Sequence, residues 1–208
     1  MLPSTPKILA LGRPYPSRYG APIISGVDRD VFRLRYFTHC SSCDFCSDAC
    51  CHHGVDIDVE NVRRLLARGP ELERYVGRPA SEWFEEEYEA DDEFPGGAAT
   101  HTRVYGGGCV FLRSNGRGCL LHSYSLERGI DYHELKPLVS ALFPLTFEDG
   151  VLCPATEVED GSLVCLANGP TLYRGIRDEL RHYFGAGLVA ELDDLERATS
   201  ADTPRGTS

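Results

Sequence analysis

The sequence lacks any hydrophobic run long enough to cross a membrane. A spanning helix needs about 20 consecutive apolar residues, and no stretch of the chain approaches that length. The N-terminal segment also lacks the sustained apolar region of a secretory signal peptide, since Ile8–Leu11 is short and is soon followed by Arg13 and Pro14. We therefore expect a cytoplasmic protein with no membrane partner.

Basic residues are scarce relative to acids. The chain has 21 Lys and Arg against 32 Asp and Glu, which gives a formal net charge of -11. Nucleic acids and anionic membranes attract proteins through basic surfaces, so we expect no nucleic-acid partner. Acidic residues are concentrated between Glu82 and Glu93. Such a run is typical of a solvated surface, and it is also where a cationic protein partner would bind.

Motifs of the common hydrolases and nucleotide-binding proteins are absent as well. There is no Gly-x-Ser-x-Gly, no His-Glu-x-x-His and no P-loop. The triplet Gly106-Gly107-Gly108 is not followed by a helical pattern, so it does not predict a phosphate site. With 208 residues, of which 42% are hydrophobic, the chain is long enough to build a core without depending on a metal or on disulfides.

The sequence does contain a dense group of soft metal ligands. Five cysteines and two histidines lie between Cys40 and His53. Packing does not require this density, whereas zinc, iron–sulfur clusters and Cu(I) prefer thiolate and imidazole ligands. Buried or disulfide-linked cysteines are the alternative, but disulfides are rare in the cytoplasm. Adjacent side chains diverge, so Cys50 and Cys51 indicate a multinuclear site, a cluster, or one ligand beside one reactive thiol.

Two further cysteines lie around a predicted β-hairpin. Strands are expected at Val104–Arg113 and Gly118–His122. Asn115-Gly116 between them favours a two-residue turn, which would join the two strands as a hairpin. This register places Cys109 opposite His122 and Leu112 opposite Cys119. Neighbouring strand residues point to opposite faces, so Cys109 and Cys119 cannot share a face in regular pairing. Either the hairpin has a bulge, or Cys119 lies beyond the regular pairing, or only one of the two binds.

Hydrophobic periodicity and turn residues predict the other elements. Strands are expected at Val31–Thr38 and Leu163–Leu166, a hairpin joins Leu138–Phe147 to Val151–Cys153, and helices are expected at Val59–Leu66, Pro70–Val76, Glu82–Tyr88, Leu172–Tyr183 and around Leu188–Leu195. The prediction is a single α+β domain with small antiparallel hairpins and several helices around a cysteine-rich metal site. It comprises a Pro-rich extended lead-in (1–30), a metal-binding core (31–167), C-terminal helices (168–198) and a disordered tail (199–208).

The ordered cysteine motifs resemble the YkgJ-like family of zinc- or iron-chelating proteins, whose signature is Cys-x-x-Cys-x-x-Cys-Cys. The chain carries Cys43-x-x-Cys46-x-x-x-Cys50-Cys51, then Gly108-Cys109-Val-Phe-Leu112, Gly118-Cys119-Leu-Leu-His122 and Lys136–Pro144, so the resemblance spans roughly residues 36–147. The spacing before the cysteine pair is one residue longer than in the signature. Ser140 stands where the family has its last cysteine.

The resemblance and the residues together predict a split thiolate site that binds zinc or iron, the latter also as an Fe–S cluster. The predicted ligands are Cys43, Cys46, Cys50, Cys51, Cys109 and Cys119, with Cys40, His53, His122 and Cys153 as further candidates. Cys165 is expected in the core. Two alternatives stay open: a metal-dependent oxidoreductase or protein-modifying enzyme component, as some relatives imply, and a metal-stabilised interaction module. A vacant coordination position beside His122 or His53 would favour catalysis.

Overall fold

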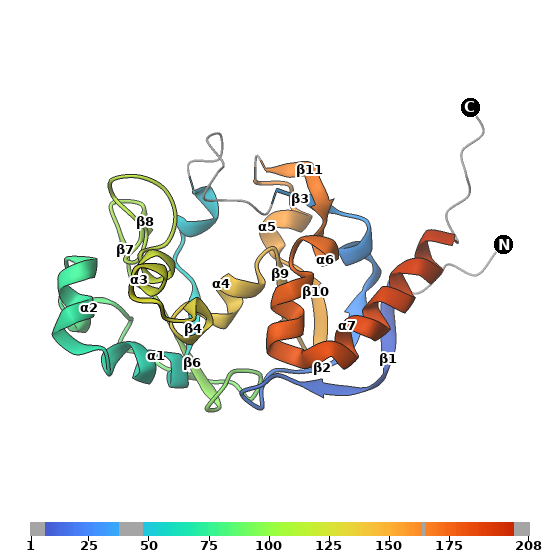
Figure 1. Ribbon diagram of the computed structural model, residues 1–208, viewed down its shortest axis with the longest axis horizontal. Coiled ribbons are helices and arrows are strands. Elements are labelled where there is room, and N and C mark those ends of the chain that lie inside the picture. Colours follow the sequence, from blue (N-terminus) through green and yellow to red (C-terminus); the bar gives the residue numbers. More distant parts are fainter. Residues whose placement is uncertain (1–6, 38–47, 164, 202–208) are drawn as a thin grey trace.

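Two hydrophobic cores organise the chain in the computed structural model, which describes residues 7–37, 48–163 and 165–201 (Figure 1). The first core combines residues from the N-terminal strands with residues from 138 to 192. The second core is built entirely from residues between Ile57 and Leu135. Helices and several small sheets make up both parts, so the predicted α+β class is confirmed.

A four-stranded sheet with the order β1-β2-β10-β9 lies in the first core. The antiparallel pair β1 (Ile8–Pro16) and β2 (Ile23–Asp28) joins the hairpin of β9 (Leu145–Glu148) and β10 (Val151–Pro154) through a parallel β2–β10 contact. The turn predicted between β9 and β10 is confirmed, and Asp149 and Gly150 both adopt positive φ there. The N-terminal lead-in therefore contributes two strands to this sheet.

The C-terminal helices pack on the same core. β11 (Leu166–Thr171) pairs with β3 (Arg35–Tyr36) and leads into α6 (Leu172–Gly175) and α7 (Arg177–Ala201). The apolar side chains of the predicted Leu172–Tyr183 helix are buried: Leu172, Ile176, Leu180 and Tyr183. Gly185, which lies between the two predicted helices, breaks α7 with φ 83°. Of the predicted disordered tail, residues 199–201 continue α7 and residues 202–208 lie outside the described part.

The second core begins with two helices that the sequence predicted correctly. Asp58 caps α1 (Val59–Leu66) by accepting a 2.6 Å hydrogen bond from the Asn61 N–H, and α2 (Gly69–Val76) ends at Gly77 with φ 78°. The remaining elements are β4 (Asp56–Asp58), β5 (Glu89–Ala90), β6 (Ala98–His101), β7 (Val104–Tyr105), β8 (Gly108–Cys109) and α3 (Leu120–Arg128). They surround Trp83, which is fully buried.

Several predicted elements are wrong. In the predicted strand Val31–Thr38, the first two residues instead belong to the 3₁₀ turn η1 (Arg29–Phe32), which the Asp28 carboxylate caps. Among residues 31–37 only β3 is a strand, and Thr38 lies outside the described residues. The helix at Glu82–Tyr88 is reduced to η4 (Ala80–Glu82), after which Trp83 and Phe84 enter the second core. The predicted hairpin strand at Leu138–Phe147 is wrong over its first half, which forms the helix α4 (Leu138–Leu142), and only the part from Leu145 onward is β9. The short helix α5 (Thr156–Glu159) follows β10.

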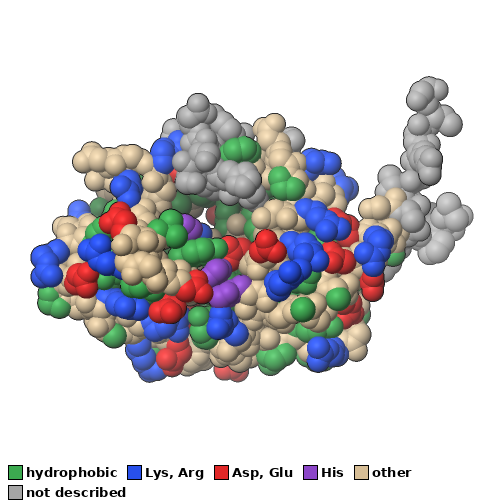
Figure 2. Space-filling view, in the orientation of Figure 1, with side chains coloured by type: hydrophobic (Ala, Val, Ile, Leu, Met, Phe, Trp, Pro, Cys, Tyr) green, Lys and Arg blue, Asp and Glu red, His purple; other side chains and the backbone are tan. Residues whose placement is uncertain are grey.

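The surface of the described residues is polar and mixed in charge. Figure 2 shows acidic and basic side chains interspersed on one face of the molecule. Among the described helices, none combines the length and the apolar character that a membrane crossing requires.

Candidate metal centre

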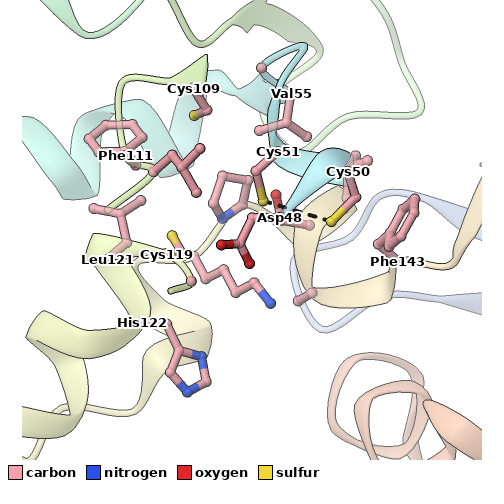
Figure 3. Close-up of a pocket in the computed structure, with 18 of the residues that line it drawn as sticks. Asp48, Cys50, Cys51, Val55, Cys109, Phe111, Cys119, Leu121, His122 and Phe143 are labelled. Carbon is pink, nitrogen blue, oxygen red and sulfur yellow. Dashed lines mark hydrogen bonds between the residues drawn. The ribbon is translucent and has the colours of Figure 1, made fainter. Parts of the chain in front are cut away.

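A cavity of about 590 Å³ lies between the two cores. Its wall comes from residues 48–56 and 109–123 on one side and from residues 132–146, 155–157 and 175–179 on the other. The described cysteines of both predicted motifs line it: Cys50, Cys51, Cys109 and Cys119. Figure 3 shows these side chains around the shared space. Cys40, Cys43 and Cys46 lie outside the described residues.

Cys50 and Cys51 occupy the 3₁₀ turn η3 (Ala49–Cys51). Their sulfurs are 3.9 Å apart, so the divergence expected for adjacent cysteines does not occur here. Hydrogen bonding from Cys51 lowers the pKa of the Cys50 thiol to about 7, and the same bond, together with burial, raises the pKa of Cys51. The contact therefore favours the thiolate form at Cys50 over that at Cys51.

A salt bridge connects the turn that carries these cysteines to the segment before Cys119. Asp48, which begins the turn with φ 56°, is buried, and its Oδ2 lies 2.9 Å from Arg117 Nε. A buried carboxylate needs such a partner, since an unpaired charge away from water is costly. The pair holds two segments about 70 residues apart in the sequence against the same cavity.

The chain geometry around Cys109 and Cys119 resolves the conflict over their faces. Leu112 forms a bridge with Cys119, as the predicted register requires. Before that bridge the chain turns, because the Leu112 N–H donates to the Cys109 carbonyl at 2.7 Å. After it, Cys119 is the N-cap of α3. Cys119 therefore ends the pairing, and both thiols reach the cavity. The expected strand at Gly118–His122 and the pairing of Cys109 with His122 are wrong. The expected strand at Val104–Arg113 is wrong as well, because this segment folds back on itself as β7 and β8, where Cys109 pairs with Val104.

The hydroxyl of Thr102 connects the backbone to the Cys109 sulfur. Thr102 is fully buried, its Oγ1 accepts a 2.9 Å hydrogen bond from the Val55 N–H, and Oγ1 lies 3.3 Å from Cys109 Sγ. Because Val55 already donates to this oxygen, the hydroxyl proton is free to point at the sulfur. Burial raises the pKa of Cys109, and the bond from Thr102 acts in the opposite direction. The contact with Thr102 thus partly offsets the effect of burial on the Cys109 thiol.

A glycine permits the close approach of two cavity-lining segments. Gly54 follows the cysteine turn with φ 77°, and a Cβ at this position would lie 2.6 Å from the Thr102 carbonyl oxygen and would also overlap His101. Only glycine fits a position with both a left-handed backbone and this contact. The cysteine turn therefore passes directly against β6.

The other candidate ligands are distributed differently. His53 and His122 line the cavity, as does Ser140. In Figure 3 His122 points away from the sulfurs, and its ring lies 4.4 Å from that of Tyr132. Burial, with a contribution from Lys136, lowers the pKa of His122.

Two cysteines lie away from this space. Cys153 does not line the cavity; its sulfur lies 3.9 Å from the Thr146 carbonyl oxygen, and burial raises its pKa to about 11. Cys165 is buried in the first core, as the sequence predicted. The four described cysteines of the two motifs are thus distinguished from the other two by their position.

The described cysteine sulfurs include one close pair but no close group of three. In a tetrahedral zinc site with Zn–S bonds of about 2.3 Å, the sulfurs lie about 3.8 Å apart, which matches the Cys50–Cys51 pair. Within residues 7–37, 48–163 and 165–201, however, no three cysteine sulfurs lie within 4.8 Å of one another. The described thiols by themselves therefore do not form a closed tetrahedral shell.

Some residues of this site were missed by sequence reasoning. Asp48 lies inside the cysteine segment, and an acidic side chain among five thiols is the sequence signal for an ion pair that holds this segment in place. Thr102 carries no signal, because its contact with Cys109 depends on the path of β6 through the second core.

Comparison of the chain with protein-family models, with curated proteins and with solved structures found no match. The resemblance to the YkgJ-like family rests on the motifs alone and stays a prediction.

Proposed function

We propose that this protein is a cysteine-rich metal-binding protein with a split thiolate centre, related to the YkgJ-like family. Cys43, Cys46, Cys50 and Cys51 supply one half, and Cys109 and Cys119 supply the other. The observation that supports this proposal is that the described cysteines from both motifs line one cavity between two separate cores. Thiols that serve only as small core residues have no reason to gather at such a join.

The proposed metal is iron, held as an Fe–S cluster, with zinc as the alternative. In a cluster, iron and sulfide atoms lie between the cysteine sulfurs, so the thiolates are farther apart than around one zinc ion. The spread of Cys51, Cys109 and Cys119 around the cavity supports the wider centre. Hydrogen bonding from Thr102 to Cys109 would adjust the affinity of the site for either metal, because such bonds change the charge on the ligating sulfur. A reducing, cytoplasmic setting keeps these thiols available.

A metal-dependent enzyme is the second candidate, and the cavity itself favours it. A volume of about 590 Å³ lies in the range of small-molecule sites. Besides the thiols, the wall carries apolar side chains such as Phe111 and Phe143 and polar groups such as Lys136 and Glu179. This combination is suited to a small organic substrate beside a metal, as in an oxidoreductase or a protein-modifying system.

The interaction module receives less support from the acidic run. Glu85 and Glu86 lie near Arg103, and the Glu93 carboxylate accepts hydrogen bonds from the Asp149 and Gly150 N–H groups. These three acidic side chains therefore make contacts within the protein itself. The exposed remainder, including Glu87 and Glu89, is the part that a cationic protein would contact.

Anaerobic purification followed by metal analysis and a visible spectrum tests the proposal. Broad absorption near about 400 nm with stoichiometric iron is expected for an Fe–S cluster, whereas a colourless protein with stoichiometric zinc would select the alternative metal. Cys109→Ser and Cys119→Ser should lose the metal, and Cys153→Ser, outside the cavity, is the matched control. A protein purified without any metal, or equal metal content in all three variants, would refute the proposal.

A further inference from the structure

Histidines and carboxylates gather at a second place, on the surface beside the thiol cavity. The donor atoms of Asp131, His133 and His182 lie within 4.8 Å of one another. Asp131 and His133 are at η5 (Tyr132–Glu134), and His182 is on α7. Figure 2 shows histidine and acidic side chains next to each other on this face. None of the three side chains lines the thiol cavity.

The surroundings of His133 match those of a metal-ligating histidine. Its Nδ1 lies 2.5 Å from Asp131 Oδ1, and its Nε2 lies 2.6 Å from Glu179 Oε2. The other oxygen of Glu179 accepts a 2.5 Å hydrogen bond from the Tyr132 hydroxyl. In metal sites, the ligating histidine typically donates its second N–H to a carboxylate that is itself held in place. Glu179 fills this role, which leaves Nδ1 on the side of Asp131.

His182 brings the second imidazole to the same place. Its ring stacks on His133 with a centroid separation of 3.6 Å and an interplanar angle of 13°. Parallel rings cannot both aim their in-plane lone pairs at one ion, so His182 must turn about its side-chain bonds to bind. It is half-buried, and on α7 it has the staggered side-chain rotamers that a helical backbone allows.

Arg18 is positioned as a competitor for this site. Its Nη1 lies 2.5 Å from His182 Nε2 and 3.4 Å from Nδ1. Burial, the neighbouring His133 and Arg18 each lower the pKa of His182. A cation that binds here must displace the guanidinium from His182.

We propose that Asp131, His133 and His182 form a binding site for a divalent first-row transition ion of the zinc type, with Glu179 as the residue that orients His133. Two imidazoles and a carboxylate are borderline ligands of the kind that Zn²⁺ and Co²⁺ prefer. The ion takes the place of the proton between His133 Nδ1 and Asp131. Because η5 adjoins the second core and α7 belongs to the first, the ion would link the two cores at the rim of the thiol cavity.

Titration of the purified protein with Co²⁺ separates this site from the thiol centre, because cobalt bound to thiolates gives an intense sulfur-to-metal charge-transfer band and cobalt bound to nitrogen and oxygen does not. We expect binding of Co²⁺ without that band, displaced by Zn²⁺. Asp131→Asn and His133→Gln should each weaken this binding about tenfold or more. Glu134→Gln, an exposed carboxylate of the same turn that pairs with Arg68, is the matched control and should bind normally.

The Arg18→Gln variant tests the direction in which Co²⁺ affinity changes. Removal of the competing guanidinium should strengthen Co²⁺ binding, whereas a role of Arg18 in merely supporting the fold would weaken it. The circular dichroism of each variant in the absence of metal checks that it is folded. Equal affinities of wild type, His133→Gln and Arg18→Gln would overturn the proposal, as would the absence of any binding without the thiolate band. Neither outcome affects the proposed thiol centre, because the two sites share no ligand.

Discussion

The hydroxyl of Thr102 provides the sharpest test of how the fold controls the thiol centre. Thr102→Val keeps the shape of this buried side chain and removes both of its polar contacts, the bond from the Val55 N–H and the bond to Cys109 Sγ. An unsatisfied buried donor costs about 1–3 kcal/mol, so the free energy of unfolding should fall by about that amount. Loss of a hydrogen bond to a metal ligand should weaken metal binding about 10–100-fold.

Thr102→Ser is the control, because it keeps the hydroxyl and removes a methyl group from a buried position. It should cost about 1 kcal/mol of stability through lost apolar burial, with metal affinity unchanged. Urea denaturation followed by circular dichroism measures the first quantity, and competition with a chelator measures the second. If the two variants bind metal equally well, the hydroxyl does not act on Cys109 and the reasoning is refuted.

Three further predictions concern other parts of the structure. Gly54→Ala should lower the urea midpoint more than the control Gly77→Ala does, because both sites have positive φ but only Gly54 faces neighbouring atoms; equal shifts would contradict the close approach. Ser140→Cys should add a thiolate to the cavity and raise the intensity of sulfur-to-metal charge transfer, and an unchanged spectrum would place Ser140 outside the centre. Hydrogen bonding from Arg177 lowers the pKa of Asp193 to about 2, below an unfolded value of about 3.9. The resulting stabilisation is present above about pH 4 and is lost as the pH falls through 2, so the difference in melting temperature between wild type and Asp193→Asn should shrink on acidification; a constant difference would contradict it.

Features that depend on a few neighbouring residues could be predicted from the sequence. The helices expected at Val59–Leu66 and Pro70–Val76 form as α1 and α2, capped by Asp58 and ended by Gly77, and the expected turn before Val151 joins β9 to β10. The apolar stripe from Leu172 to Tyr183 is buried, because helical periodicity places these side chains on one face. The two cysteine motifs were also evident, since their density has no explanation in packing.

Tertiary structure decided which of these features meet. The strands near the N-terminus join β10 in parallel, a pairing between segments more than 100 residues apart that no local pattern indicates. The same holds for the contact of Thr102 with Cys109 and for the pairing of His133 with Glu179. Local propensity sets the conformation of a segment, whereas burial of apolar surface from the whole chain sets its neighbours. The chain therefore carries its candidate metal-binding thiols in visible cysteine motifs, and the packing of two cores places the described members of these motifs around one cavity.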